Sequence, residues 1–162
     1  MTDNCVVDIK TQNRQQRGYI LFLLLLVFIA SHVDRQIVAI LQEPIRIAFD
    51  LTDTQLGVLT GFAFALFYAT LGMPMAMWAD RRNRRNLIAF SISLWSAMTV
   101  ACAAAGQYWQ LLAARIGVAV GEAGSNPPSH SIIADLYEPA ERATAMAIFG
   151  LGVNFGIMFG FL

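Results

Sequence analysis

An all-α membrane protein with about five transmembrane helices is the fold class that the sequence predicts, and two observations predict it. The chain is 57% hydrophobic and only 14% charged, whereas a soluble domain carries about 25% charged residues. Four stretches contain no Asp, Glu, Lys or Arg, namely 18–33, 54–79, 86–114 and 143–162. Because a helix needs about 20 mostly apolar residues to cross the hydrocarbon core, these stretches and their flanks have spanning length.

The chain divides into a polar tail, residues 1–17, and a transmembrane region, residues 18–162. We expect the tail to be disordered on the cytoplasmic side. Pro44 helps to end the first helix, and Thr52 with Gln55 has the spacing of a capping box at the start of the second. Tyr108 and Trp109 follow a tight turn and are placed as membrane-interface anchors. The predicted helices are 18–42, 55–79, 86–105, 109–137 and 142–162.

The basic residues predict which side each loop occupies. With the N-terminus inside, the segments on the cytoplasmic side hold eight Lys and Arg residues, and the outer loops hold only Arg46. Cytoplasmic loops of membrane proteins carry such an excess. The eight residues are Lys10, Arg14, Arg17, Arg81, Arg82, Arg84, Arg85 and Arg142.

Small residues recur at four-residue spacing on two predicted helices. Gly152, Gly156 and Gly160 form two consecutive GxxxG steps, and Gly57 with Gly61 forms one. Faces of this kind let membrane helices approach closely, so we interpret both as packing surfaces rather than ligand sites.

Four charged residues lie deep within predicted spans: Asp34 and Arg35 on the first helix, and Arg115 and Glu122 on the fourth. Tyr19 to Asp34 and Tyr137 back to Glu122 are both fifteen residues, which places both carboxylates about 22 Å from the cytoplasmic face. Arg35 lies at nearly the same level and is expected to pair with Glu122, Asp34 or both. Arg115 is expected about 10 Å further out, on nearly the same face as Glu122.

This cluster suits proton coupling. Burial of a carboxylate favours its protonated form and a nearby arginine favours the ionised form. A cavity that alternates between the two sides of the membrane can therefore bind and release a proton. Intramembrane ionisable groups are functional candidates by default. The alternative is a permanent ion pair that only fastens two helices together. His32 precedes Asp34 by two residues and should point to another side of the helix, so it is a weaker candidate for proton coupling than the four charged residues.

Two prolines interrupt the fourth predicted helix. Pro127 and Pro128 remove backbone donors and should kink it, leaving free carbonyl groups. Ser125, Asn126 and Ser129 either satisfy these carbonyls or contact a substrate.

A second charged cluster lies in the predicted cytoplasmic loops. It can serve as a latch that holds helix ends together in one conformation and opens in another. The alternative is that its arginines only set the orientation of the chain. The candidate residues are Asp80, Arg81, Arg84, Arg85, Asp135, Glu141 and Arg142.

Three motifs resemble the major facilitator superfamily. "AMWADRRNRR" (Ala76 to Arg85) is similar to its loop G-x-x-x-D-R-x-G-R-R, with Ala76 and Asn83 in place of the glycines. This loop, "DRQIVAIL" from Asp34 and "ARIGVAVGEAGSNPPSHSIIADLY" from Ala114 resemble bacterial members of the Spinster branch. Ala119 stands where the last motif usually has glycine.

The resemblance implies the N-terminal part, about five helices, of a twelve-helix fold that works by alternating access. It implies that Asp34 and Glu122 sense protons, with Arg35 and Arg115 beside them, and that Asp80, Arg84 and Asp135 form the cytoplasmic latch. "GEAG" before the prolines is also similar to organic-anion symporters of the superfamily. We therefore expect a truncated chain that lacks the C-terminal helices of the same transporter.

The predicted function is secondary active transport of a small amphipathic, lipid-like or organic-anion solute, coupled to protons, in a bacterial inner (cytoplasmic) membrane. The expected partners are this solute, protons and the lipid bilayer, with no nucleic acid. The sequence shows no HExxH, GxSxG or paired-cysteine motif, so no enzyme activity, cofactor or metal is predicted. The alternative is a non-transporting membrane fragment that self-associates through its glycine faces.

Overall fold

The computed structural model describes the backbone of residues 3–81 and 83–162 and the side chains of residues 14–78 and 83–162. Every regular element in these ranges is a helix, which confirms the predicted class. Four helical segments are long and apolar enough to cross a membrane: Arg14–Ile40, Asp53–Trp78, Arg84–Ala103 and Pro139–Gly160. The elements are α1 (Asp3–Ile40), α2 (Gln42–Ala48), α3 (Asp53–Gly57), the π-helix η1 (Val58–Phe62), α4 (Ala63–Arg81), α5 (Arg84–Ala103), α6 (Tyr108–Ala123), α7 (Asn126–Leu136) and α8 (Pro139–Gly160).

Helix α1 begins far earlier than the sequence predicted. It starts at Asp3, so the expectation of a disordered tail is wrong from that residue onward. No proline or glycine occurs between Asp3 and Gly18, and these are the residues that most strongly oppose a helix. At its other end α1 stops at Ile40, and Pro44 lies in the first turn of the short helix α2.

The second predicted span is built from three consecutive elements, α3, η1 and α4. Its start has the predicted capping box, because the Thr52 hydroxyl accepts from the Gln55 N–H and the Gln55 side chain accepts from the Thr52 N–H. The π-helical turn then occupies Val58–Phe62. Such turns contain one residue more than the equivalent α-helical segment.

The fourth predicted span is not one helix. Residues 109–137 form α6 and α7, which are separated at Gly124 and Ser125. Pro127 and Pro128 cannot donate the backbone hydrogen bonds that would continue α6. The Ser125 hydroxyl donates to the Glu122 carbonyl at 2.9 Å, and the Ser129 hydroxyl donates to the Ser125 carbonyl at 2.7 Å. Both serines therefore satisfy carbonyl groups near the break.

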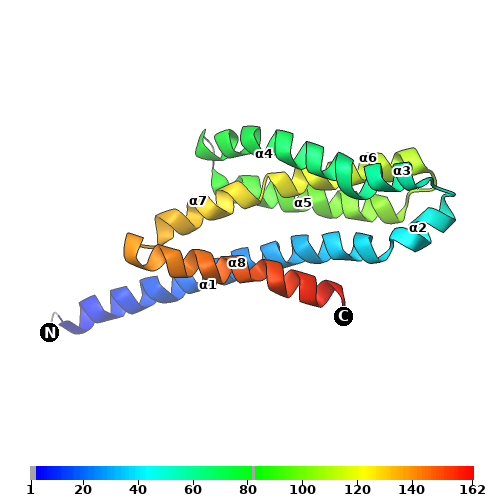
Figure 1. The fold of residues 1–162 in the computed structure, drawn as a ribbon. Coiled ribbons are helices and arrows are strands. Elements are labelled where there is room, and N and C mark those ends of the chain that lie inside the picture. The colour runs from blue at the N-terminus through cyan, green and yellow to red at the C-terminus, as the bar shows by residue number, and fades with distance from the viewer. Residues whose placement is uncertain (1–2, 82) are drawn as a thin grey trace.

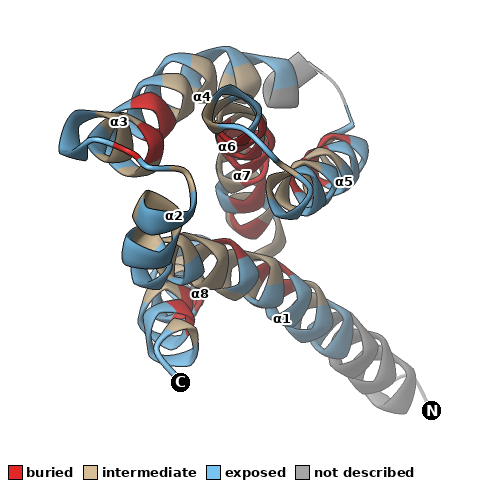
Figure 2. Cartoon of the chain, turned by 90° about the vertical axis from the view of Figure 1, so that its right-hand side faces the viewer, coloured by how far each residue is buried: buried red, intermediate tan, exposed pale blue. Residues whose placement is uncertain are grey.

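The connections alternate between the two ends of the bundle. The start of α1, the end of α4 with the start of α5, and the α7–α8 connection lie at one end, and the segment from α1 to α3 and the α5–α6 connection lie at the other (Figure 1). All the segments predicted to be cytoplasmic are thus at one end. Buried residues gather on α6 and α7, with α1, α4 and α5 arranged around them (Figure 2).

Glycines allow α8 to lie directly against α1. A Cβ atom on Gly152 would lie 2.8 Å from the Phe28 ring, and one on Gly156 would lie 2.9 Å from the Ile29 carbonyl oxygen. The predicted packing role of this glycine face is therefore confirmed. Gly57 and Gly61 differ, because a Cβ atom there would meet no described atom within 4 Å. Their predicted packing role finds no partner helix within the described ranges.

Candidate functional site

Two crossed ion pairs join α1 to α6. Arg35 Nη2 lies 2.6 Å from Glu122 Oε2, and Arg115 Nη1 lies 3.0 Å from Asp34 Oδ2. Neighbouring residues on α1 thus pair with residues two turns apart on α6. Of the alternatives that the sequence left open for Arg35, the structure shows Glu122. The Arg115–Asp34 pair was not predicted, because the depth estimate counted backbone rise and ignored the length of an arginine side chain.

These charges lie largely out of solvent. The side chains of Glu122 and Arg115 are 1% and 5% exposed, against 14% for Asp34 and 31% for Arg35. Buried ionised groups are tolerated only when they are paired and hydrogen-bonded. The two pairs supply that compensation, and Arg35 is the member with the best access to solvent.

The two carboxylates differ in how fully they are satisfied. Asp34 accepts from Arg115 at Oδ2 and from the Thr99 hydroxyl of α5 at Oδ1, 3.2 Å away. Glu122 accepts from Arg35 at Oε2 only, and its buried Oε1 has no hydrogen-bond partner among the described residues. Arg115 Nε is likewise buried and unpartnered there. Among the described atoms of the four charged residues, one buried acceptor, Glu122 Oε1, and one buried donor, Arg115 Nε, therefore have no partner.

Aromatic rings of α4 cover the two arginines. Arg35 Cζ lies 4.8 Å from the ring centroids of both Phe64 and Tyr68, and Arg115 Cζ lies 5.3 Å from that of Phe64. Both distances suit cation–π attraction. The sequence analysis missed these rings, because aromatic residues are common in apolar spans. The i, i+4 spacing of Phe64 and Tyr68 is the signal that could have placed them on one face.

The α6–α7 break also contributes a polar residue. Asn126 Nδ2 donates to the Tyr68 hydroxyl at 3.2 Å, and Asn126 Oδ1 is buried without a partner in the described part of the chain. Asn126 therefore does not cap a freed carbonyl as Ser125 and Ser129 do. It connects the break to the aromatic face of α4.

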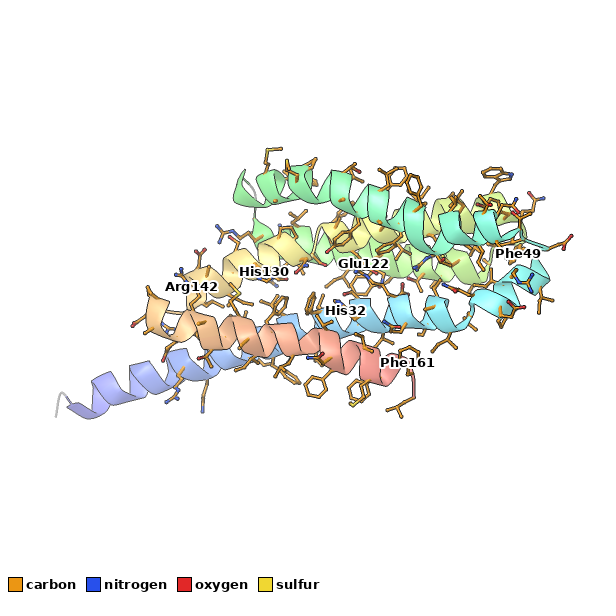
Figure 3. The ribbon with its side chains drawn as sticks, in the orientation of Figure 1. His32, Phe49, Glu122, His130, Arg142 and Phe161 are labelled. Atoms are coloured by element: carbon orange, nitrogen blue, oxygen red, sulfur yellow. The ribbon has the colours of Figure 1, made fainter. Side chains whose placement is uncertain are left out.

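His32 lies apart from the crossed pairs. Its Nδ1 is 2.9 Å from the Phe28 carbonyl oxygen of the same helix, and its Cβ lies against Gly156 of α8. Figure 3 shows His32 on α1 and Glu122 on α6. These contacts agree with the expectation that His32 points to another side of the helix than Asp34.

The charged cluster that the sequence predicts to be cytoplasmic is brought together only in part. An ion pair joins Arg84 at the start of α5 to Asp135 near the end of α7. Arg142 donates to the Ala134 carbonyl at 2.7 Å. Arg85 and Glu141 are exposed, and neither forms an ion pair with a described side chain. The side chains of Asp80 and Arg81 lie outside the described residues.

A cavity of about 960 Å³ opens at the same end, between the first turns of α8 and the part of α1 near Arg17. Glu141 lines it together with Arg14, Arg17 and Glu138. The crossed ion pairs do not contribute to its walls. Among the side chains that the structure describes, no group of three or more His, Cys, Asp or Glu residues has metal-binding geometry.

The sequence model of the Major Facilitator Superfamily matches residues 23–162. The chain belongs to this superfamily. Its members are transporters and not enzymes, and the helical arrangement described above matches the N-terminal part of their fold.

Known relatives refine this placement. A crystal structure of a bacterial homolog of the human lysosomal transporter Spinster, inward-facing and unoccupied, superposes with a TM-score of 0.85 and 46% identity, over 89% of this chain and 30% of that one. An MFS-type efflux pump of Mycolicibacterium smegmatis is 37% identical over 130 residues, which are 80% of this chain and 30% of the pump. A probable L-galactonate transporter of Escherichia coli is 26% identical over 152 residues, or 94% of this chain and 33% of that protein. This chain thus spans about a third of the length of these relatives.

Proposed function

We propose that this chain is the solute- and proton-binding part of a secondary active transporter that works by alternating access. The solute is a small amphipathic, lipid-like or organic-anion molecule, and the membrane is a bacterial cytoplasmic membrane with the N-terminus inside. The observation that carries the proposal is the pair of crossed ion pairs, in which the buried Glu122 has one oxygen free.

The free oxygen suggests how proton and solute are linked. A proton bound at Glu122 Oε1 neutralises the carboxylate and removes its attraction for Arg35. Arg35 is the more exposed partner, so its guanidinium becomes available to a carboxylate or phosphate of the solute, groups that arginine binds well. In this mechanism proton binding and anion binding favour each other.

Asp34 and Arg115 form the second half of the mechanism. Both oxygens of Asp34 are engaged, one by Arg115 and one by Thr99 of α5, whereas Glu122 keeps one oxygen without a described partner. We assign Asp34 and Arg115 to a later step, in which α1 and α6 separate. At the cytoplasmic end, the Arg84–Asp135 pair is the proposed latch, with Asp80, Arg81, Arg85, Glu141 and Arg142 as its remaining candidates.

The intact mass of the polypeptide in its source membrane comes first, because the chain spans only part of its relatives. A mass above the 17.8 kDa of this sequence means that transport assays need the additional residues. That native polypeptide is then reconstituted into vesicles with an imposed pH gradient, and uptake of a sugar acid and of a lysophospholipid is measured.

We expect uptake of one of these solutes to depend on the pH gradient. Glu122→Gln and Asp34→Asn should each lower it at least tenfold. Glu43→Gln is the matched control, because it removes a carboxylate from an exposed ion pair, with Arg46. Uptake that is unchanged in both of the first two variants contradicts the assigned roles.

A second candidate is a non-transporting fragment that self-associates. The face of Gly152, Gly156 and Gly160 is occupied by α1, which disfavours it as a contact between copies. The open space at Gly57 and Gly61 favours that pair instead. This alternative predicts cross-linking between copies in membranes that Gly61→Leu abolishes, and no uptake of solute at any pH.

A further inference from the structure

Phe64 occupies a special position, because its ring contacts one arginine from each crossed ion pair. The ring centroid lies 4.8 Å from Arg35 Cζ and 5.3 Å from Arg115 Cζ. Phe64 is almost fully buried. It belongs to α4, whereas the four charged residues belong to α1 and α6. It therefore connects a third helix to both ion pairs.

The chemistry of the ring suits two cations that are held near one another. The negative face of an aromatic ring attracts a guanidinium group, most strongly where water is excluded. Two arginines in one site repel each other, and a shared ring reduces the cost of keeping both there. An aliphatic side chain of similar size would fill the same space without this attraction.

The backbone before Phe64 is also unusual. The π-helical turn Val58–Phe62 ends two residues earlier. Because each residue of an α-helix turns it by about 100°, the extra residue of a π turn rotates everything that follows by about that angle. The capping box fixes the start of α3 at Thr52. The direction of Phe64 toward the arginines therefore depends on the π turn.

We propose that Phe64 is a positioning residue for transport. It holds Arg35 and Arg115 in the crossed arrangement, and η1 aims it at them. When a carboxylate is neutralised or an arginine moves to the solute, the ring keeps both guanidinium groups within the site. The proposal rests on the transport function proposed above, and it adds a role for α4 that the charged residues do not supply.

The decisive test changes the electron density on the face of the ring while the size of the ring stays nearly constant. Phenylalanine with one, two or three ring fluorines is incorporated at position 64 of the native polypeptide, since each fluorine weakens the negative face. Phe149 is the matched control, because it is fully buried, stacks on Phe28 and meets the His130 ring edge-on, and no described arginine lies over its face. The rate of pH-dependent uptake and the melting temperature in detergent are both measured.

We expect both quantities to fall with each added fluorine at position 64 and to stay level at position 149. The uptake rate of Phe64→Leu should be roughly tenfold lower, and Phe64→Tyr, which keeps the ring face, should restore most of it. A deletion of Gly61, which removes the extra residue of the π turn, should resemble Phe64→Leu.

Two results would overturn the proposal. If neither the uptake rate nor the melting temperature changes with added fluorines at position 64 or at position 149, Phe64 only fills space. A melting temperature that falls while uptake stays level would mean that the ring stacks on the arginines without positioning them for transport. If the unmodified protein moves no solute, the transport proposal itself fails, and the melting series still decides whether the ring holds the arginines.

Discussion

Arg35 makes two contacts with a single oxygen of Glu122. Its Nε donates to Oε2 at 2.8 Å, and its Nη2 lies 2.6 Å from the same atom. A guanidinium group can instead engage both oxygens of a carboxylate, one N–H to each. The arrangement seen here leaves Glu122 Oε1 buried and without a partner in the ranges described. The geometry of the ion pair therefore leaves Glu122 Oε1 able to accept a hydrogen bond.

Replacement of Arg35 by lysine tests whether the shape of the guanidinium matters. Arg35→Lys keeps the positive charge but loses the two adjacent donors and much of the stacking on Phe64 and Tyr68. We expect uptake at limiting solute to fall about tenfold. Arg46→Lys, in the exposed pair with Glu43, is the control and should change uptake less than twofold. If uptake falls no further in Arg35→Lys than in Arg46→Lys, the charge at position 35 is required and the shape of the guanidinium group is not.

Thr99 is expected to stabilise the fold through its hydrogen bond to Asp34. Thr99→Val keeps the shape of the side chain and removes the hydroxyl that donates to Asp34 Oδ1. The free energy of unfolding in detergent should fall by about 1 kcal/mol. Thr99→Ser, which retains the hydroxyl, should restore most of it. A serine variant as unstable as the valine variant would show that the threonine methyl group, and not the hydrogen bond, stabilises the fold.

The close approach of α8 to α1 predicts different costs for two glycines. A Cβ atom on Gly156 would lie 2.9 Å from the Ile29 carbonyl oxygen, so Gly156→Ala must push the helices apart. We expect a loss of roughly 1–3 kcal/mol in the free energy of unfolding. Gly57→Ala meets no described atom within 4 Å and should be neutral or slightly stabilising. Thermal unfolding in detergent measures both, and similar losses would contradict the packing shown here.

The Arg84–Asp135 ion pair predicts a recoverable charge reversal. Arg84→Asp and Asp135→Arg should each lower the free energy of unfolding by up to about 1 kcal/mol, because the pair is partly exposed. The variant that carries both substitutions should regain most of the loss. High salt should shrink all three differences. Losses that simply add in the double variant would show that the two residues do not act on each other.

The sequence was sufficient for the parts of the fold that depend on charge and composition. The charge-free stretches located the membrane-spanning segments, since exclusion of charge from lipid acts on every residue of a span. Counting fifteen residues to Asp34 and to Glu122 predicted that these two carboxylates lie at the same depth, which brings α1 and α6 together. The capping box at Thr52 was also recognisable, because it depends on two residue types at fixed spacing.

Features that depend on packing could not be predicted from the sequence pattern. "VLTGF" carries no signal for a π turn, since its residues suit an α-helix equally well. The prolines at 127 and 128 predicted a kink, but the division into α6 and α7 also depends on how Ser125 and Ser129 satisfy the backbone. The contact of Phe64 with both arginines follows from the rotation of α4, which a residue pattern does not report.

The break between α6 and α7 has a mechanical consequence. Glu122 lies on one side of it and Asp135 on the other, so a single polypeptide segment carries one residue of the crossed ion pairs and one residue of the pair with Arg84. Bending a continuous helix disrupts its backbone hydrogen bonds, but Pro127 and Pro128 have no N–H to disrupt. The segment can therefore act as a compliant joint. Arg35 ties the arm that bears Glu122 to α1, and Arg84 ties the arm that bears Asp135 to α5, so a bend at this joint changes the distance between the two ties.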